Sequence, residues 1–377
     1  MYGRAFGTYQ HTICNILTIS TLFKSHQIRA EGTSVQSAQR SALIISSHPT
    51  SSSQLFIMAS LRNNYMPRRE VLTLPRQLNF EPVTAADMSS VAPLLRRSGS
   101  RSCDFTAGGI FLWIQYFGYE QCIVDDTLFL KGLSEDISRR PSFALPVGKI
   151  PLTESVDMVR AYCRRHGLPP LFSAVPEDRL QDLVALGATE INELTDWADY
   201  IYLASDLATL TGKRYNKKRN HVHRFEADNP GCRLEPLDST SLAEAIDFFE
   251  RLGIESEKAD PAMAEFEREQ VLDVLRNYGD YPFEGAVLRD GHGRIVAFTA
   301  GEVIGDTLVL HIEKMEHSIS GAGETINNYF ARYMLARHPE IVYINREDDS
   351  GDPGLRYAKQ SYHPAMMLRK YNVLMRE

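Results

Sequence analysis

A strand, a glycine-containing loop, a helix and a second strand follow one another between residues 307 and 349, and this order constrains the fold most. Residues 307–314 (TLVLHIEK) alternate apolar and polar side chains, which predicts a half-buried strand. The loop 317–323 contains two glycines and leads into an amphipathic run with helical spacing. Free backbone N–H groups at the start of such a helix suit an anionic ligand. The next strand, 341–344, ends in the charged run 345–349 (NREDD); packing gives no reason for charge there, so we predict a site.

The composition is that of a soluble globular protein long enough for two domains. The chain has 377 residues, of which 43% are hydrophobic and 24% are charged. Its net charge of −7 argues against nucleic-acid binding over the whole surface, although a local basic patch is compatible with it. Charged residues interrupt the longest apolar runs well before the ~20 residues that a membrane-spanning helix needs, so we expect no transmembrane segment.

Five cysteines are scattered along the chain without a CxxC pair: Cys14, Cys103, Cys122, Cys163 and Cys232. An odd number without paired spacing favours reduced thiols in the cytoplasm over disulfides or zinc. His311 and His317 also lack a second ligand at metal-binding spacing. We therefore expect a cytoplasmic protein with no metal site and no tightly bound cofactor.

Residues 1–66 differ from the rest of the chain. They are rich in serine and threonine, and Glu31 is their only acidic residue. We predict a disordered leader, or an upstream extension of the gene model with the true start at Met58 or Met66. A secretory signal is the alternative, but no small-residue cleavage site clearly follows the apolar stretch.

From Arg76 onward, one order of elements occurs twice, and the second copy is the clearer. Its first helix is capped by Ser239-Thr240, and its second helix opens at Asp260-Pro261. Three strands in series follow, joined by the hairpin signals Asp290–Gly293 and Gly305-Asp306. The predicted elements of this copy cover residues 232–237, 239–252, 260–278, 285–289, 294–303, 307–314, the helix after the glycine loop, 341–345, 353–360 and 366–375.

The first copy is fainter, and sequence identity between the two halves is negligible. Its predicted elements cover residues 78–83, 85–96, 105–116, 121–131, 143–145, 154–166, 171–175, 177–186 and 199–203. Two copies of one plan indicate a tandem arrangement. We therefore predict a leader at 1–66, an N-terminal domain at 67–205 and a C-terminal domain at 206–377 that carries the site.

The element order β-α-α-β-β-β-α-β-α-β is that of the GCN5-related N-acetyltransferase fold, an α/β fold with a mixed sheet. Three segments, 103–113, 199–225 and 344–364, resemble a family of bacterial proteins of unknown function related to the C-terminal domain of phosphatidylglycerol lysyltransferase. The resemblance covers the chain from Arg76 to its end. It implies two tandem acetyltransferase-like domains and kinship with enzymes that move an amino acid from aminoacyl-tRNA to a lipid or a peptide.

A basic helix is predicted between Gly212 and Phe225, with an apolar side that seats it on the domain. Its cations fall on two adjoining stripes: Lys213, Lys217 and Arg224 on one, Arg214, Lys218 and His221 on the other. Cations crowded on one face predict a clamp for phosphates of tRNA, of a lipid headgroup or of coenzyme A. The alternatives are a solvated helix that links the two domains and generic nucleic-acid binding without acyl transfer.

The charged run after strand 341–344 supplies the predicted catalytic groups. Glu347 and Asp348 could accept the proton that an attacking amine must lose. The fold also implies a tyrosine acting as general acid near the short helix, either Tyr357 or Tyr362. We assign catalysis to Arg346, Glu347, Asp348 and Tyr357, and acceptor binding to Asn345, Glu313, Arg356, Lys359 and Tyr362. The alternative is a structural ion-pair network between the strand end and the helix.

The glycine loop supplies the remaining donor-side residues, Ser318, Gly321 and Gly323. Coenzyme-A-binding members of the fold usually begin this loop with Gln or Arg, and that side chain is missing here. The departure weakens coenzyme A as the donor and leaves room for aminoacyl-tRNA.

We predict an aminoacyl- or acyltransferase that moves an activated acyl group, preferably from aminoacyl-tRNA, to an amine or hydroxyl acceptor such as a lipid headgroup or peptide. The alternatives are a coenzyme-A-dependent N-acyltransferase and a non-catalytic binding protein for a phosphorylated ligand. The transferase prediction requires that the surroundings of Lys217, Gly321 and Arg346 converge on one cleft.

Overall fold

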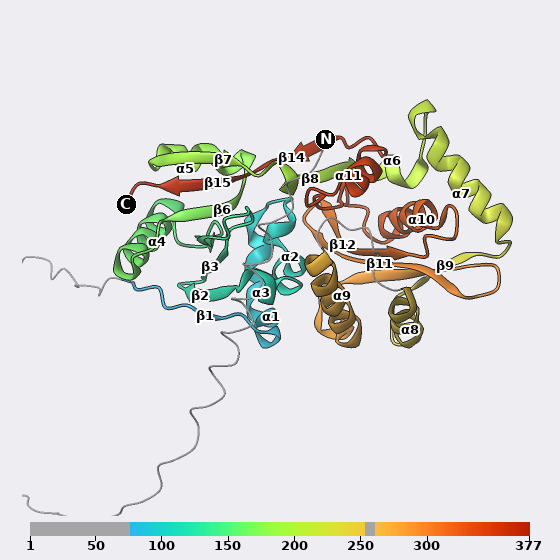
Figure 1. Cartoon of the computed structure of the whole chain (residues 1–377), viewed down its shortest axis with the longest axis horizontal. Helices are drawn as coiled ribbons and strands as arrows, with labels where there is room; N and C mark the ends of the chain where they lie inside the picture. The colour runs from blue at the N-terminus through green and yellow to red at the C-terminus, as the bar shows by residue number, and fades with distance from the viewer. Residues whose placement is uncertain (1–75, 253–260) are drawn as a thin grey trace, which may run out of the picture. The chain divides into compact units, whose positions relative to one another are not determined.

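The computed structural model describes residues 76–252 and 261–377, which form two mixed β-sheets flanked by helices (Figure 1). The predicted leader, 1–66, lies outside the described residues. None of the described helices combines the length and the apolar character that a membrane span requires. All cysteines within these ranges are free thiols.

The first sheet has the strand order β1-β2-β3-β4-β6-β15-β7, and β5 also pairs with β3. Helices α4 and α5 pack on one face through Phe143 and Phe172, and α1 and α2 pack on the other through Leu128 and Leu130. The strands are β1 (Glu81–Pro82), β2 (Glu120–Val124), β3 (Thr127–Leu133), β4 (Pro141–Phe143), β5 (Val147–Gly148), β6 (Leu171–Pro176), β7 (Ala188–Glu193) and β15 (Lys370–Met375). The helices are α1 (Met88–Leu95), α2 (Ala107–Phe111), α3 (Ile114–Phe117), α4 (Leu152–His166) and α5 (Leu180–Ala185).

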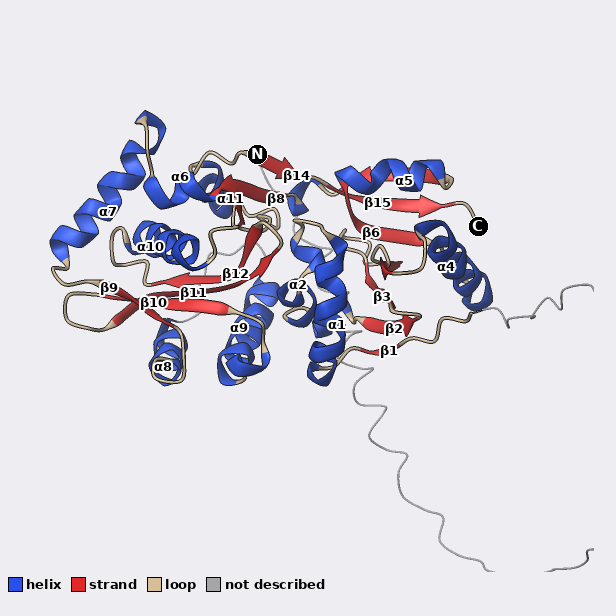
Figure 2. Cartoon of the chain, turned by 180° about the vertical axis from the view of Figure 1, so that it is seen from behind, coloured by secondary structure: helices blue, strands red, loops and turns tan. Residues whose placement is uncertain are grey.

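The second sheet has the order β14-β8-β13-β12-β11-β10-β9. Helices α8 and α9 cover one face through Phe298 and Ile312, and α10 covers the other against Leu308 and Leu310 (Figure 2). Its strands are β8 (Asp199–Leu203), β9 (Arg233–Pro236), β10 (Glu284–Arg289), β11 (Ile295–Ile304), β12 (Thr307–Met315), β13 (Tyr343–Asn345) and β14 (Met366–Leu368). The helices are α6 (Ala204–Thr209), α7 (Asn216–Asp228), α8 (Leu242–Leu252), α9 (Pro261–Arg276), α10 (Ala322–Arg337) and α11 (Pro353–Gln360).

Each sheet receives a strand next to its edge from the other half of the chain. Strand β8 pairs with β13 and β14 in the second sheet, and β15 pairs with β6 and β7 in the first. The prediction that 199–203 closes the first half is therefore wrong, as is that of one unbroken last strand over 366–375. That segment breaks at Arg369, and its second part crosses to the first sheet. The proposed domain boundary at residue 205 stays a prediction.

Most other elements lie where the sequence predicts them, and α11 matches its predicted range of 353–360. The predicted basic helix is α7, preceded by a 3-10 turn at Lys213–Tyr215. Strand β7 is missing from the prediction because nearly all its side chains are exposed, so it has no apolar alternation.

Candidate functional site

The site lies where two parallel strands of the second sheet separate. Strands β12 and β13 pair through three residues only, and the last pair is Val309 with Asn345. Next to this point, a bulge in β12 leaves His311 without a partner on β11, because Ala300 pairs with Ile312 and Gly301 with Leu310. A bulge re-aims side chains. His311 and Glu313 therefore face opposite sides of the sheet, although they are two residues apart.

Five residues meet on the α10 side of the sheet, and we call them the arginine cluster: Arg346, Glu313, Tyr362, Lys218 and Glu324. Arg346 Nη2 donates to Glu313 Oε1 at 2.6 Å. The ring of Tyr362 has the guanidinium of Arg346 4.9 Å from its centroid and the amine of Lys218 at 4.0 Å. Lys218 also pairs with Glu324 at 3.3 Å. Helix α7, the first turn of α10 and the end of β13 therefore converge.

Several buried polar atoms of this region have no hydrogen-bond partner among the described residues: Nη1 of Arg346 and, on α10, Oδ1 of Asn327, Oγ1 of Thr325 and Oδ1 of Asn328. The first two lie beside Glu313, which Arg346 contacts through Nη2 and Asn327 through Nδ2 at 3.3 Å. Buried polar groups are rarely left unsatisfied. A ligand with a hydrogen-bond acceptor for Arg346 and a donor for Asn327 would satisfy both.

A second ion-pair group lies on the opposite side of the sheet. His311 is fully buried between Glu347, 2.7 Å from Nδ1, and Glu302, 3.1 Å from Nε2. Burial alone disfavours the imidazolium, but the two carboxylates outweigh it and raise the pKa of His311 to about 9. Glu302 also accepts the backbone N–H of Gly108 at 2.8 Å, and a Cβ at Gly108 would lie 2.2 Å from the His311 ring.

Glu347 has a backbone conformation that non-glycine residues rarely adopt. Its φ is 56°, and its N–H donates to Oδ1 of Asn345 at 2.7 Å. Such strain costs ~1–3 kcal/mol and persists where the surroundings fix it. Here, the fixing contacts are Asn345 on the backbone and His311 on the side chain.

A buried lysine connects the exchanged strand to the same region. Lys370 Nζ contacts Asp104 at 2.7 Å, Asp199 at 2.8 Å and Sγ of Cys103 at 3.3 Å. Ligand atoms of Cys103, Asp104 and Asp199 lie within 4.8 Å of one another, as in a metal site. The ammonium of Lys370 bonds to all three, so it supplies the positive charge of this cluster.

The predicted residues after Arg346 do not form one cluster. Arg356 bonds bidentately to Asp349 and also to Asp196. These contacts form the structural ion-pair network that the sequence analysis gave as the alternative to a binding role. Lys359 is buried and donates to the backbone carbonyls of Arg346, at 2.6 Å, and of Asp348. It therefore supports the loop that follows β13.

Two further catalytic candidates occupy different environments. The Asp348 carboxylate accepts from the N–H and hydroxyl of Ser350, and burial raises its pKa to about 6. The side chain of Tyr357 is 75% exposed on α11. The catalytic and binding roles assigned from the sequence stay predictions.

The donor-side residues divide between an exposed basic face and a buried contact. Lys213, Arg214, Lys217 and His221 are exposed, Arg214 pairs with Asp206, and Ser318 bonds to Glu316. Gly321 precedes α10 with a φ of 83°, and a Cβ there would lie 2.4 Å from the carbonyl oxygen of His221. The glycine thus lets the loop touch α7. Gly323 follows in the first turn of α10, and a Cβ there would lie 3.2 Å from Met315.

Sequence reasoning missed the partners that define the site. It interpreted His311 as an ordinary strand residue and gave no role to Glu302, Asn327 or Lys370. The available signal was a polar or charged residue inside an apolar strand or helix, such as Glu302 within β11, whose other residues are almost all buried and apolar. Such a residue predicts a buried partner but does not name it.

A family model described as phosphatidylglycerol lysyltransferase, C-terminal, matches residues 95–374. The chain belongs to this family. A conserved protein of unknown function from Bacteroides thetaiotaomicron is 29% identical with a TM-score of 0.71, covering 80% of this chain and 100% of that one. The structure of L-PGS from Bacillus licheniformis is 15% identical with a TM-score of 0.56, covering 80% and 94%.

A curated relative, an uncharacterized protein from Mycoplasmoides gallisepticum, is 20% identical over 176 residues. The match covers 46% of this chain and 55% of the relative, so the chain spans about half the length of that protein. The fold is a mixed α/β fold of two tandem GCN5-related N-acetyltransferase-like domains.

Proposed function

We propose that the protein transfers an aminoacyl group from aminoacyl-tRNA to an amine or hydroxyl acceptor, such as a lipid headgroup or a peptide. The observation that carries the proposal is a pair of unsatisfied atoms: Nη1 of Arg346 in the arginine cluster and Oδ1 of Asn327, which contacts Glu313 of that cluster. An aminoacyl ester has a carbonyl oxygen for the guanidinium and an α-ammonium for the amide oxygen. Glu313 and Glu324 add negative charge beside the ammonium. A simple acetyl group offers no such donor.

Helix α7 supports a nucleic-acid donor rather than a small one. Lys213, Lys217 and His221 are exposed, and Lys218 of the same helix reaches the arginine cluster. Exposed cations bind phosphates without reading the sequence. In this arrangement, the tRNA backbone would lie along α7 and its aminoacyl end would enter at Lys218.

Catalysis would depend on charged side chains that lie close to the reacting atoms. The acceptor nitrogen or oxygen attacks the ester carbonyl, and Arg346 stabilises the oxyanion that forms on the carbonyl oxygen. The bond to the ribose oxygen then breaks, and that oxygen takes up the proton that the acceptor has given to the base. Asp348, whose pKa of about 6 suits proton uptake near neutral pH, is the proposed base for the acceptor proton. Glu347 is less available because it already bonds to protonated His311.

The test is transfer of radiolabelled amino acid from a mixture of charged tRNAs to total membrane lipid and to cell-wall peptide precursors, in parallel. We expect label in one acceptor fraction and loss of at least about 100-fold in Arg346→Lys, which keeps the charge but loses the guanidinium. Arg337→Lys is the matched control, since Arg337 lies exposed on α10 and pairs with Glu284. Transfer from acetyl-coenzyme A without any from charged tRNA would overturn the proposal.

A further inference from the structure

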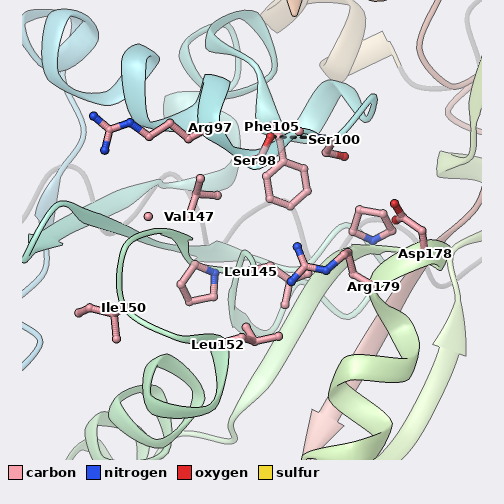
Figure 3. Close-up of a pocket in the computed structure, with 14 residues that line it drawn as sticks. Arg97, Ser98, Ser100, Phe105, Leu145, Val147, Ile150, Leu152, Asp178 and Arg179 are labelled. Atoms are coloured by element: carbon pink, nitrogen blue, oxygen red, sulfur yellow. Dashed lines mark hydrogen bonds between the residues drawn. The ribbon is translucent and has the colours of Figure 1, made fainter. Parts of the chain in front are cut away.

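The first half of the chain contains a cavity of about 180 Å³ at a position that corresponds to the arginine cluster (Figure 3). Strands β4 and β6 are the fourth and fifth strands of their sheet counted from β1, as β12 and β13 are in the other sheet counted from β9. They are also parallel, and they pair only at Phe143 and Phe172. After β4 the chain turns away to pair with β3 as β5, and the cavity lies where β4 and β6 separate.

The two separations are filled differently. In the second sheet, the ion pairs of Glu313 with Arg346 and of His311 with Glu347 bridge the diverging strands. In the first sheet, no such ion pair fills the corresponding space among the described residues, and half of the fourteen residues that line it are apolar. Its apolar lining consists of Phe105, Leu145, Pro146, Val147, Ile150, Leu152 and Pro176.

Three charged residues line the cavity, Arg97, Asp178 and Arg179, and they are arranged unequally. Figure 3 shows the guanidinium of Arg179 directed toward the middle of the cavity, while that of Arg97 is directed away. Arg97 bonds to Asp126 at 2.9 Å, and Arg179 uses its Nε to bond Asp182 at 2.8 Å. The terminal nitrogens of Arg179 thus face the apolar lining. An arginine placed in this way offers two parallel N–H donors to a carboxylate or a phosphate.

The volume limits what fits beside the arginine. An apolar cavity of ~150 Å³ is large enough to bind benzene. A cavity of about 180 Å³ therefore accepts one aromatic ring or a short alkyl group, and the rest of a long acyl chain would lie outside it. The walls are held close together: Gly148 lies against the β2–β3 turn, where a Cβ would be 2.2 Å from the carbonyl oxygen of Asp126.

We propose that this cavity is a second binding site, for an organic anion with an apolar group about the size of a benzene ring. The carboxylate or phosphate binds to Arg179, and the apolar group lies against Phe105, Leu145, Val147 and Leu152. The site is in the half of the chain that lacks the arginine cluster. It therefore stands independently of the proposed transferase activity.

Phenyl phosphate is the probe, because it combines a benzene ring with a phosphate. Inorganic phosphate and benzyl alcohol are the controls for the head and the ring alone. Isothermal titration calorimetry on the full chain should give a Kd for phenyl phosphate below about 1 mM and at least tenfold lower than for either control. Benzoate should also bind, whereas dodecyl phosphate should bind no more tightly than phenyl phosphate, because most of its chain would lie outside the cavity.

Two variants locate the binding. Arg179→Gln removes the anion contact from an exposed turn and should raise the Kd at least tenfold, and Val147→Trp fills the cavity and should abolish binding. Arg165→Gln is the matched control: Arg165 is exposed on α4 and bonds to Gln77, away from the cavity. The proposal is overturned if inorganic phosphate binds as tightly as phenyl phosphate, if phenyl phosphate does not bind, or if Arg179→Gln has the affinity of the parent. Because the readout is binding, failure here leaves the transferase proposal untouched.

Discussion

Removing both partners of the buried Arg346–Glu313 pair should separate its structural role from its functional one. The two side chains are only 13% and 14% exposed, so both charges lie in a poorly solvated environment. Arg346→Met alone leaves the carboxylate of Glu313 buried without its cation. Breaking a buried pair in this way costs about 3–5 kcal/mol. The double variant Arg346→Met/Glu313→Met removes both charges and should return to within about 1 kcal/mol of the parent, because an apolar pair of similar volume replaces them.

The double variant should regain stability but not activity. The double variant folds but has no guanidinium for the carbonyl oxygen, so aminoacyl transfer should fall at least about 100-fold. Urea unfolding followed by tryptophan fluorescence gives the free energies, and transfer of label from charged tRNA gives the rates. Arg337→Met is the control for stability: its pair with Glu284 is half exposed and should be worth less than about 1 kcal/mol. The reasoning fails if the double variant is as unstable as the single one, or if it transfers label at the parental rate.

Three further predictions concern charge elsewhere in the chain. The pKa of His311 is raised from 6.5 to about 9, so the stability that its charge contributes is complete below pH 6.5 and is lost as pH rises to 9. In His311→Gln, the change of the unfolding free energy over that pH range should therefore be smaller by up to about 3 kcal/mol. Lys213→Ala with Lys217→Ala should weaken tRNA binding and lower the slope of log affinity against log salt by about two, measured by filter binding at several salt concentrations. Lys370→Met leaves Asp104 and Asp199 buried without their cation and should cost about 3–5 kcal/mol in urea unfolding.

The order of elements could be predicted from the sequence, because it depends on local signals. Turn residues such as Gly305-Asp306 and alternating apolar residues in β11 and β12 mark the hairpin directly. Helix α7, the glycine loop and the end of β13 do come together, with Lys218 rather than the exposed Lys217 as the residue nearest Arg346, whereas the single cleft stays a prediction. Lys217 and Lys218 are adjacent on the helix, but only the side chain of Lys218 faces the interior.

The strand exchange and the bulge could not be predicted from these signals. The sequence of β15 would show the same pattern whether the strand paired in the second sheet or in the first, because pairing partners distant in sequence leave no local pattern. The bulge at His311 also leaves no pattern in the sequence, yet it places His311 and Glu313 on opposite sides of the sheet. Simple alternation would have put both on one side. A sequence argument therefore joins the charged residues into one cluster where the structure has two.

A chain of buried hydrogen bonds nevertheless leads from the exchanged strand to Glu347, the residue that follows Arg346. Lys370 of the exchanged strand bonds to Asp199, Asp199 accepts from Asn345 at 2.8 Å, and Asn345 accepts the N–H of Glu347, which bonds to His311. Each member is buried or nearly so, and a partly satisfied buried network is costly, which favours keeping all members in place together. Glu347 follows Arg346 directly, and Lys359 donates to the carbonyl oxygen of Arg346 at 2.6 Å, so the same loop holds the backbone that carries the guanidinium. The strand contributed from the end of the chain to the first sheet thus helps to position the arginine of the second.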